Sequence, residues 1–201
     1  MSSDSYTGPL LSTWTETSSH VLDSVVAANR AAFAAFGLTD DAGTLPPTTE
    51  RIEADEDLPE WSVSVGVESR EDIDVGTSVE FTKTISEADI ERFAAASGDT
   101  NPLHLDDEFA QKTRFRGRIA HGTLVGGLIS AALARLPGLV VYLSQDLEFY
   151  NPVRIGDRVT ADIEIVEDLG DDQYRLNTTV VDGDDTLIDG EAVVLIDEMP
   201  E

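Results

Sequence analysis

The chain has 201 residues, of which 41% are hydrophobic, so it carries enough apolar side chains to build a packed core. It contains no cysteine, which excludes disulfides, thiolate metal sites and cysteine nucleophiles, and with three histidines we expect no metal site. No run approaches the roughly 20 apolar residues of a membrane-spanning helix, and the N-terminus lacks the basic and apolar regions of a secretory signal. We therefore expect a cytoplasmic protein without a membrane span.

Acidic residues dominate the charge, because 40 Asp and Glu against 13 Lys and Arg give a net charge of −27. The acids are spread along the whole chain rather than gathered in a tail, and Lys83 and Lys112 are the only lysines. This pattern indicates adaptation to a salt-rich cytoplasm, where counterions screen the repulsion between like charges. The missing basic face argues against a nucleic-acid partner.

Two segments precede the main domain. Ser19–Phe36 places its apolar residues largely on one stripe at helical spacing, and Gly37 marks the end of this predicted helix. Thr39–Glu60 is acidic and contains prolines, which is typical of a linker or an irregular arm. We therefore divide the chain into a helical extension with its linker, 1–72, and a folded domain, 73–201.

The domain opens with a strand and a helix. Val79–Ile85 alternates apolar and polar residues, as a half-buried strand does. Ser86 and Asp89 have the spacing of a capping box, which predicts a helix that begins there and stops at Gly98. After a turn-rich stretch, Asp106–Lys112 favours a second, short helix.

The longest apolar run, Gly122–Leu136, is rich in Gly, Ala and Leu and predicts a helix buried on nearly all sides. Turn signals separate the strand-like runs that follow it. One strand, a buried helix and further strands predict an α+β domain whose antiparallel sheet wraps around the central helix. The later runs are Leu139–Tyr150, Asp157–Asp168, Tyr174–Val181 and Leu187–Ile196.

The residues best suited to chemistry stand between the first two predicted helices of the domain. Asp99 and His104 are five residues apart in a polar turn that Pro102 stiffens. A carboxylate and an imidazole held close together can share one water, one group taking a proton while the other supplies one. The same residues also fit a helix cap, an ordinary turn and a structural histidine, so spacing alone leaves both interpretations open.

Two sequence blocks resemble a known family. The run from Ser97 to His104, SGDTNPLH, resembles the hydratase-2 signature of the MaoC-like, (R)-specific enoyl-CoA hydratases. Arg118–Leu124 resembles the second block of the same family, and the similarity extends over roughly residues 75–196. The resemblance implies a hot dog fold, in which an antiparallel sheet wraps around a central helix, and a homodimer.

The resemblance also implies roles for single residues. Asp99 and His104 match the catalytic pair, which positions a water for addition to C3 of an enoyl thioester and delivers a proton to C2 on the same face. Gly122 matches the glycine whose backbone N–H meets the thioester oxygen, and the predicted helix N-terminus there suits an oxyanion. Ser130 matches a serine that supports the aspartate, with simple helix packing as the alternative.

Two neighbouring residues receive supporting roles. Asn101 is expected to fix the turn rather than to touch the substrate. His121 also resembles a family position, but because it stands beside the predicted helix start we interpret it as structural. No cofactor is expected, since coenzyme A is part of the substrate.

A basic island stands out in this acidic chain. Lys112, Arg114, Arg116 and Arg118 fall within seven residues, directly before the oxyanion glycine. Because arginine binds phosphate through two parallel hydrogen bonds, we expect at least one of these arginines to hold the phosphates of coenzyme A. The alternative is a loop that neutralises the acidic residues 106–108.

The resemblance therefore implies a hydro-lyase, an (R)-specific enoyl-CoA hydratase that supplies polyhydroxyalkanoate synthesis or a fatty-acid route. The alternatives are a hydratase or dehydratase of another acyl-CoA, a hot dog thioesterase, and a non-catalytic granule-binding scaffold. The apolar stripe of Ser19–Phe36 needs a partner surface. That surface is either the catalytic domain or its dimer mate, or a polyhydroxyalkanoate granule.

Overall fold

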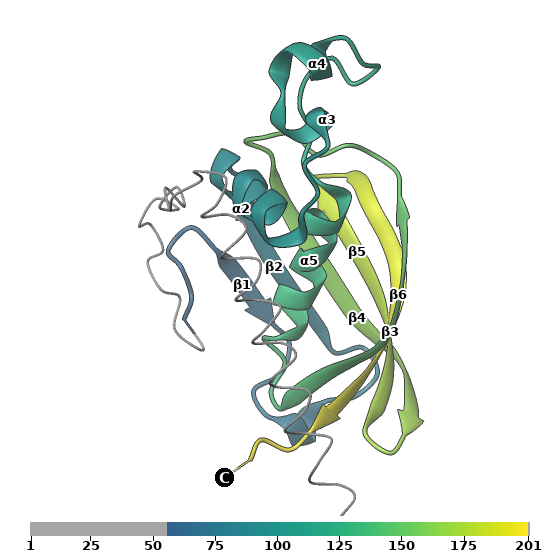
Figure 1. The fold of residues 1–201 in the computed structure, drawn as a ribbon. Coiled ribbons are helices and arrows are strands. Elements are labelled where there is room, and N and C mark those ends of the chain that lie inside the picture. The colour runs from purple at the N-terminus through teal and green to yellow at the C-terminus, as the bar shows by residue number, and fades with distance from the viewer. Residues whose placement is uncertain (1–55, 201) are drawn as a thin grey trace, which may run out of the picture. The chain divides into compact units, whose positions relative to one another are not determined.

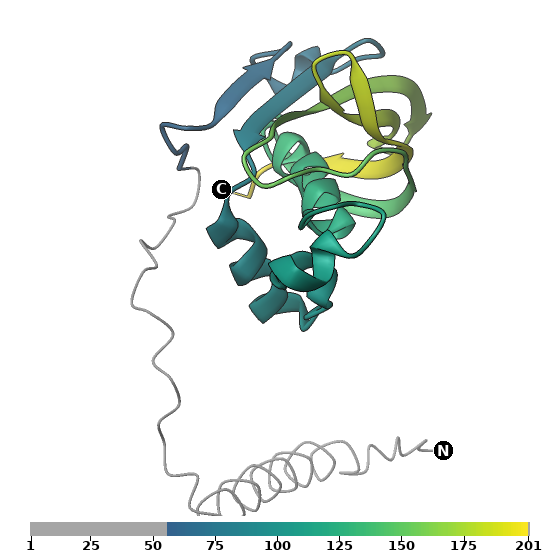
Figure 2. The same ribbon diagram turned by 90° about the horizontal axis from the view of Figure 1, so that it is seen from above.

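The computed structural model describes residues 56–200, whose centre is a curved sheet around one helix (Figure 1). Neighbouring strands are antiparallel, in the order β1-β2-β4-β5-β6-β3. The view from above in Figure 2 shows the sheet curving around α5 (Gly122–Leu133). The strands are β1 (Ser62–Val65), β2 (Ser78–Thr84), β3 (Leu139–Phe149), β4 (Arg158–Gly170), β5 (Gln173–Asp182) and β6 (Asp185–Asp197).

The strands form because apolar and polar residues alternate along them. In β4, Val159, Ala161, Ile163 and Ile165 are buried, whereas the residues between them are more exposed. These four side chains pack in one apolar cluster with the buried face of α5. Since a fully buried aliphatic side chain contributes about 1.5–3 kcal/mol, this repeated pattern is sufficient to close the sheet on the helix.

The prediction that the central helix is buried on nearly all sides is wrong for the described chain. Val125, Ile129 and Leu133 face the sheet and are buried, but Gly127 and Ser130 on the opposite side are exposed. The sheet covers only one side of the helix. The residues on its other side are small. They do not interrupt the apolar run in the sequence, but they have little apolar surface to bury.

Most of the other predicted elements are confirmed. The strand β2, the short helix α4 (Asp107–Gln111) and the four C-terminal strands fall where the sequence places them. The helix α2 (Glu87–Ser97) begins with the predicted capping box: Asp89 N–H donates to Ser86 Oγ at 3.2 Å, and the Asp89 carboxylate accepts from Ser86 N–H at 2.8 Å. Local sequence patterns therefore determine these elements.

Other elements were not predicted. β1 pairs with β2, and the ring of Trp61 beside it meets Phe81 edge-on at 5.4 Å, so the sheet begins before residue 73. A four-residue strand carries too short an alternation to be recognised. The single-turn helices η1 (Arg70–Asp72) and α3 (Pro102–Leu105) were also missed.

The predicted helix Ser19–Phe36 and the linker up to residue 55 lie outside the described residues. In the described part, no helix has the length and apolar character needed to cross a membrane.

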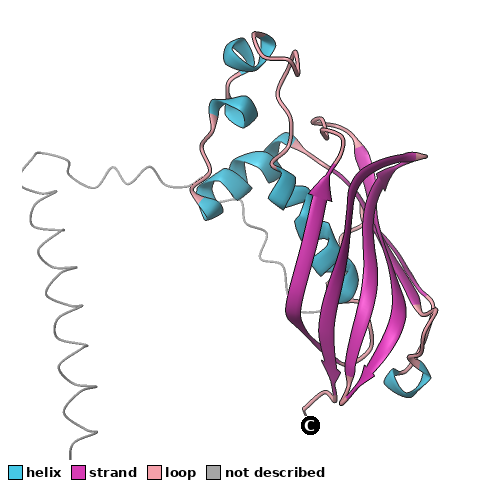
Figure 3. Cartoon of the chain, turned by 90° about the vertical axis from the view of Figure 1, so that its right-hand side faces the viewer, coloured by secondary structure: helices cyan, strands magenta, loops and turns pink. Residues whose placement is uncertain are grey.

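The helices α2, α3 and α4 form the connection from β2 to α5. Figure 1 shows α3 and α4 projecting beyond the end of the sheet, above the N-terminus of α5. The side view in Figure 3 places α5 against one face of the sheet, with the shorter helices beyond its end. This connection carries every predicted site residue that precedes α5.

Candidate active site

Asp99 lies in the turn that follows α2. Gly98 ends the helix in the left-handed region, with φ of 77°, which glycine adopts without strain. The Asp99 N–H then donates to Ser97 Oγ, and the Asp99 carboxylate accepts from the Asn101 N–H, each at 3.2 Å. The turn thereby fixes the backbone of Asp99 and leaves its side chain exposed.

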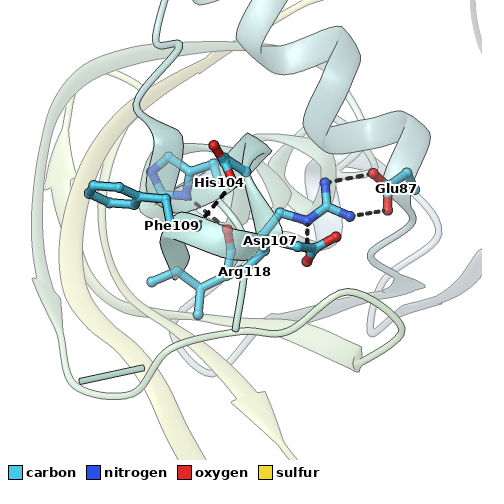
Figure 4. Close-up of polar contacts among 7 residues, drawn as sticks. Glu87, His104, Asp107, Phe109 and Arg118 are labelled. Carbon is cyan, nitrogen blue, oxygen red and sulfur yellow. Dashed lines mark hydrogen bonds and ion pairs between the residues drawn. The ribbon is translucent and has the colours of Figure 1, made fainter. Parts of the chain in front are cut away.

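His104 is held in place by α3. Asn101 caps this helix by accepting the Leu103 N–H at 3.0 Å, and Pro102 occupies its first turn. The His104 ring is only 8% exposed, and its Nδ1 lies 2.8 Å from the carbonyl oxygen of Ile119 (Figure 4). Because a carbonyl only accepts, Nδ1 carries the proton. In the neutral ring Nε2 is then an unprotonated base.

Asp99, His104 and His121 come together at the end of the sheet. A carboxylate oxygen and one nitrogen of each ring lie within 4.8 Å of one another. Two groups that each bind one water at about 2.8 Å can be up to about 5.6 Å apart, so Asp99 and His104 are close enough to share a water. The two imidazole rings lie against each other, with centroids 3.9 Å apart and planes tilted by 31°. At this separation the carboxylate and the imidazole of His104 can exchange a proton with one shared water.

His104 and Gly122 both line a cavity of about 250 Å³. Gly122 is the first residue of α5, where backbone N–H groups have no partner within the helix and the positive end of the helix dipole lies. A Cβ at this position would stand 2.8 Å from the Phe149 ring, so no side chain fits without displacing the ring. The remaining lining residues are mainly apolar or aromatic: Arg114, Phe115, Ile119, Ala120, Val125, Phe149, Tyr150, Asn151, Pro152, Val153 and Ile188.

The three arginines of the basic island occupy different surroundings. Arg114 lines the cavity and lies over the Phe115 ring at 4.8 Å, with its side chain exposed. Arg116 is exposed and has a positive φ of 57° in the turn before Gly117. Of the three arginines, Arg114 alone lines the cavity.

Arg118 is already engaged by two carboxylates. Its guanidinium donates two hydrogen bonds of 2.7 Å to Glu87 and a third of 3.0 Å to Asp107, which ties α2 to α4 (Figure 4). The hydrogen bond from Arg118 lowers the pKa of Glu87, and the same bond raises the pKa of Arg118. For this residue the contacts favour the alternative of a loop that neutralises nearby acids.

Ser130 is not among the residues gathered around His104. It lies exposed on α5, eight residues and therefore about 12 Å along the helix axis from Gly122.

Two residues that the sequence did not predict contribute to the site. Phe149 packs against Gly122, and Arg154 donates to the Phe115 carbonyl at 2.6 Å, which secures the loop that carries Arg114. Both arrive from across the fold, so no local spacing could reveal them.

Comparison with known proteins places this arrangement in a family. Residues 71–189 match the family model of the MaoC like domain. A 3-hydroxybutyryl-CoA dehydratase of Methylorubrum extorquens is 46% identical over 134 residues, which cover 65% of this chain and 85% of that protein. An (R)-specific enoyl-CoA hydratase of Rhodospirillum rubrum is 46% identical over 129 residues, covering 63% and 90%. The solved (R)-hydratase from A. caviae, involved in PHA biosynthesis, matches with a TM-score of 0.60 at 37% identity, covering 63% and 98%.

The curved antiparallel sheet around α5 is the hot dog fold that the resemblance predicted, and the solved hydratase shares it. The chain belongs to the MaoC-like domain family. The predicted class of enzyme, a hydro-lyase, is confirmed by the hydratases and dehydratases among its relatives.

Proposed function

We propose that the protein is an (R)-specific enoyl-CoA hydratase, which reversibly adds water to trans-2-enoyl-CoA and gives (R)-3-hydroxyacyl-CoA. The observation that carries the proposal is the hydrogen bond between His104 Nδ1 and the Ile119 carbonyl, because it leaves Nε2 of this cavity-lining histidine as an unprotonated base. The exposed carboxylate of Asp99 completes the pair. The printed activities of the two relatives at 46% identity support the same reaction class.

The proposed reaction divides the water between two carbon atoms. Asp99 and His104 hold the water; as its oxygen bonds to C3, the pair takes one proton from the water and delivers that proton to C2. The electrons of the C2–C3 double bond pass through an enolate, whose oxygen accepts a hydrogen bond from the Gly122 N–H. The proton taken from the water is the one delivered to C2, so both residues end the reaction in their starting states and act as a unit.

The same proposal assigns the coenzyme A phosphates to exposed cations at the cavity. Arg114 is the first candidate, because it lines the cavity and its guanidinium is exposed. Arg116 is the second, two residues along the same loop. Arg118 is the weakest candidate of the three, since its N–H donors already bind Glu87 and Asp107. Support of Asp99 by Ser130 would need a contact that the two residues do not make within the described part of one chain.

A hydration assay tests the function directly. Crotonyl-CoA should lose its enoyl thioester absorbance, and the product should be (R)-3-hydroxybutyryl-CoA by chiral analysis. Release of free CoA thiol without hydration would instead identify a thioesterase. Turnover of other enoyl-CoA thioesters alone would identify a hydratase of another substrate, and no conversion of any thioester would leave a non-catalytic scaffold.

We also propose that the protein works as a cytoplasmic homodimer. β3 lies at the edge of the sheet and exposes Leu139, Val141 and Leu143 at 44%, 41% and 51%. An edge strand has backbone groups on its outer side that no strand of the sheet binds, and together with exposed apolar residues these favour pairing with a strand of another chain. Sedimentation analysis measures the oligomeric state.

Two further proposals concern storage granules: the protein supplies polyhydroxyalkanoate synthesis, and Ser19–Phe36 associates with the granule. Co-sedimentation of full-length and truncated protein with granules tests the association.

A further inference from the structure

His121 makes contacts that exceed those of a packing residue. Its ring is 1% exposed and lies between Phe93, at 4.9 Å, and His104, at 3.9 Å between ring centroids. It precedes Gly122 as the cap residue of α5, but its side chain makes no hydrogen bond to that helix. Instead its Nε2 lies 3.0 Å from the main-chain carbonyl oxygen of Asp99.

The direction of this hydrogen bond follows from its partner. A carbonyl oxygen only accepts, so Nε2 of His121 must carry the proton. The other nitrogen, Nδ1, is buried and has no hydrogen-bond partner among the described residues. The ring therefore donates a hydrogen bond to Asp99 through Nε2, and its face packs against the ring of His104.

The reacting groups are all held by one stretch of chain. His104 is bound through Nδ1 to the main chain of Ile119, and Asp99 is bound through its main chain to His121. Gly122 is the next residue, and as the first residue of α5 its N–H has no partner within the helix. The distances among the base, the carboxylate and the oxyanion site therefore depend on residues 119–122, and His121 supplies the link to Asp99.

We propose that His121 is a positioning residue, which holds Asp99 at the correct distance from His104 and from the Gly122 N–H. The inference rests on the proposed hydratase function and assigns to that site a residue which does not itself touch the substrate. A displacement of about 1 Å in such a group can lower a rate about 100-fold, because the reacting atoms must meet in one geometry.

Two substitutions separate the donor from the ring. His121→Phe keeps a buried aromatic ring beside His104 and Phe93 but removes the N–H donor. His121→Gln loses the ring but can place an amide N–H near the Asp99 carbonyl. We expect H121F to lower kcat for crotonyl-CoA by about 10- to 100-fold with KM nearly unchanged, and H121Q to regain most of that loss. Wild-type kcat in a folded H121F, or no recovery in a folded H121Q, overturns the proposal.

A spectroscopic measurement keeps the inference testable apart from activity and apart from the variants' folding. Long-range proton–nitrogen NMR of the wild-type chain should show His121 as the Nε2–H tautomer, and the carbonyl carbon of Asp99 should shift in H121F. The Nδ1–H tautomer in the wild-type protein contradicts the hydrogen bond itself. If the tautomer is as expected but the wild-type protein hydrates no enoyl-CoA, the proposed function fails while the link to Asp99 stands.

Discussion

The curved sheet and the polar segment 98–121 that lies at its end are held together by different kinds of contact. In the sheet and α5, apolar side chains from all parts of the domain share one cluster, and Ile129 is fully buried within it. In the polar segment, single side chains bind single backbone groups, as Asn101, His104 and His121 do.

This difference predicts that stability and geometry can be changed separately. A cluster of many apolar contacts sets the free energy of unfolding, because each member contributes a share of it. A few hydrogen bonds in the polar segment contribute about 1 kcal/mol each to stability, yet they fix the positions of the catalytic groups. Substitutions in the two regions should therefore have opposite signatures, and the following predictions test that contrast.

The largest effect is expected at the pair itself. Asp99→Asn and His104→Gln should each lower kcat by about 10²- to 10⁴-fold, since each removes one partner in proton transfer. The thermal midpoint should change little for Asp99→Asn, whose side chain is exposed. The double variant should be hardly worse than either single one, because the two residues act as a unit. Retained activity in either folded variant would refute the catalytic assignment.

The opposite signature is expected in the core. Ile129→Ala leaves a cavity at a fully buried position and should lower the free energy of unfolding by about 2–5 kcal/mol. Urea denaturation measures this loss. Below the unfolding transition, kcat should stay near the wild-type value, because α5 keeps its N-terminus at Gly122. A parallel fall in kcat at full folding would show that the two regions are coupled.

A smaller effect should distinguish two arginines of the same loop. Arg114→Gln should raise KM for crotonyl-CoA by about 3- to 10-fold and leave a short pantetheine thioester unaffected, because only coenzyme A brings the phosphates. Arg118→Gln is the matched control: it breaks the bonds to Glu87 and Asp107 and should lower stability by about 1 kcal/mol without this preference for the phosphates. Equal KM changes for both thioesters in Arg114→Gln would indicate a structural role.

The smallest effect concerns the contact between the sheet and α2, the helix that leads into the polar segment, where Lys83 of β2 binds Asp89 of α2 at 2.9 Å. Burial raises the pKa of Asp89, but hydrogen bonds from Lys83 and Ser86 outweigh it, so the pKa lies below its ordinary value of 3.8. The carboxylate therefore stabilises the fold above that pH and loses its contribution as the pH falls through the lowered pKa. Asp89→Asn should cost about 1 kcal/mol at neutral pH, and the gap to wild type should close in acid, as denaturation curves at several pH values would show.

The sequence determined most of the helices and strands and most of the candidate site. The capping box at Ser86 and the alternation along β4 are local signals, so α2 and the strand could be predicted from the residues in them. Asp99, Asn101 and His104 stand within six residues of one another, and the turn at Asp99 and the Asn101 cap of α3 keep them close along the chain. The resemblance then gave Gly122 a role that the N-terminus of α5 makes physically reasonable.

Only the tertiary structure decided which partners the polar side chains choose. Arg114 and Arg118 look alike in the sequence, but Glu87, from 31 residues away, takes the guanidinium of one and leaves the other exposed at the cavity. His121 likewise gained its link to Asp99 across 22 residues. Apolar periodicity is a property of neighbouring residues and can be read along the chain. A hydrogen bond to a distant residue forms only when the donor and the acceptor point toward each other at the correct distance. The packing of the folded chain sets that geometry.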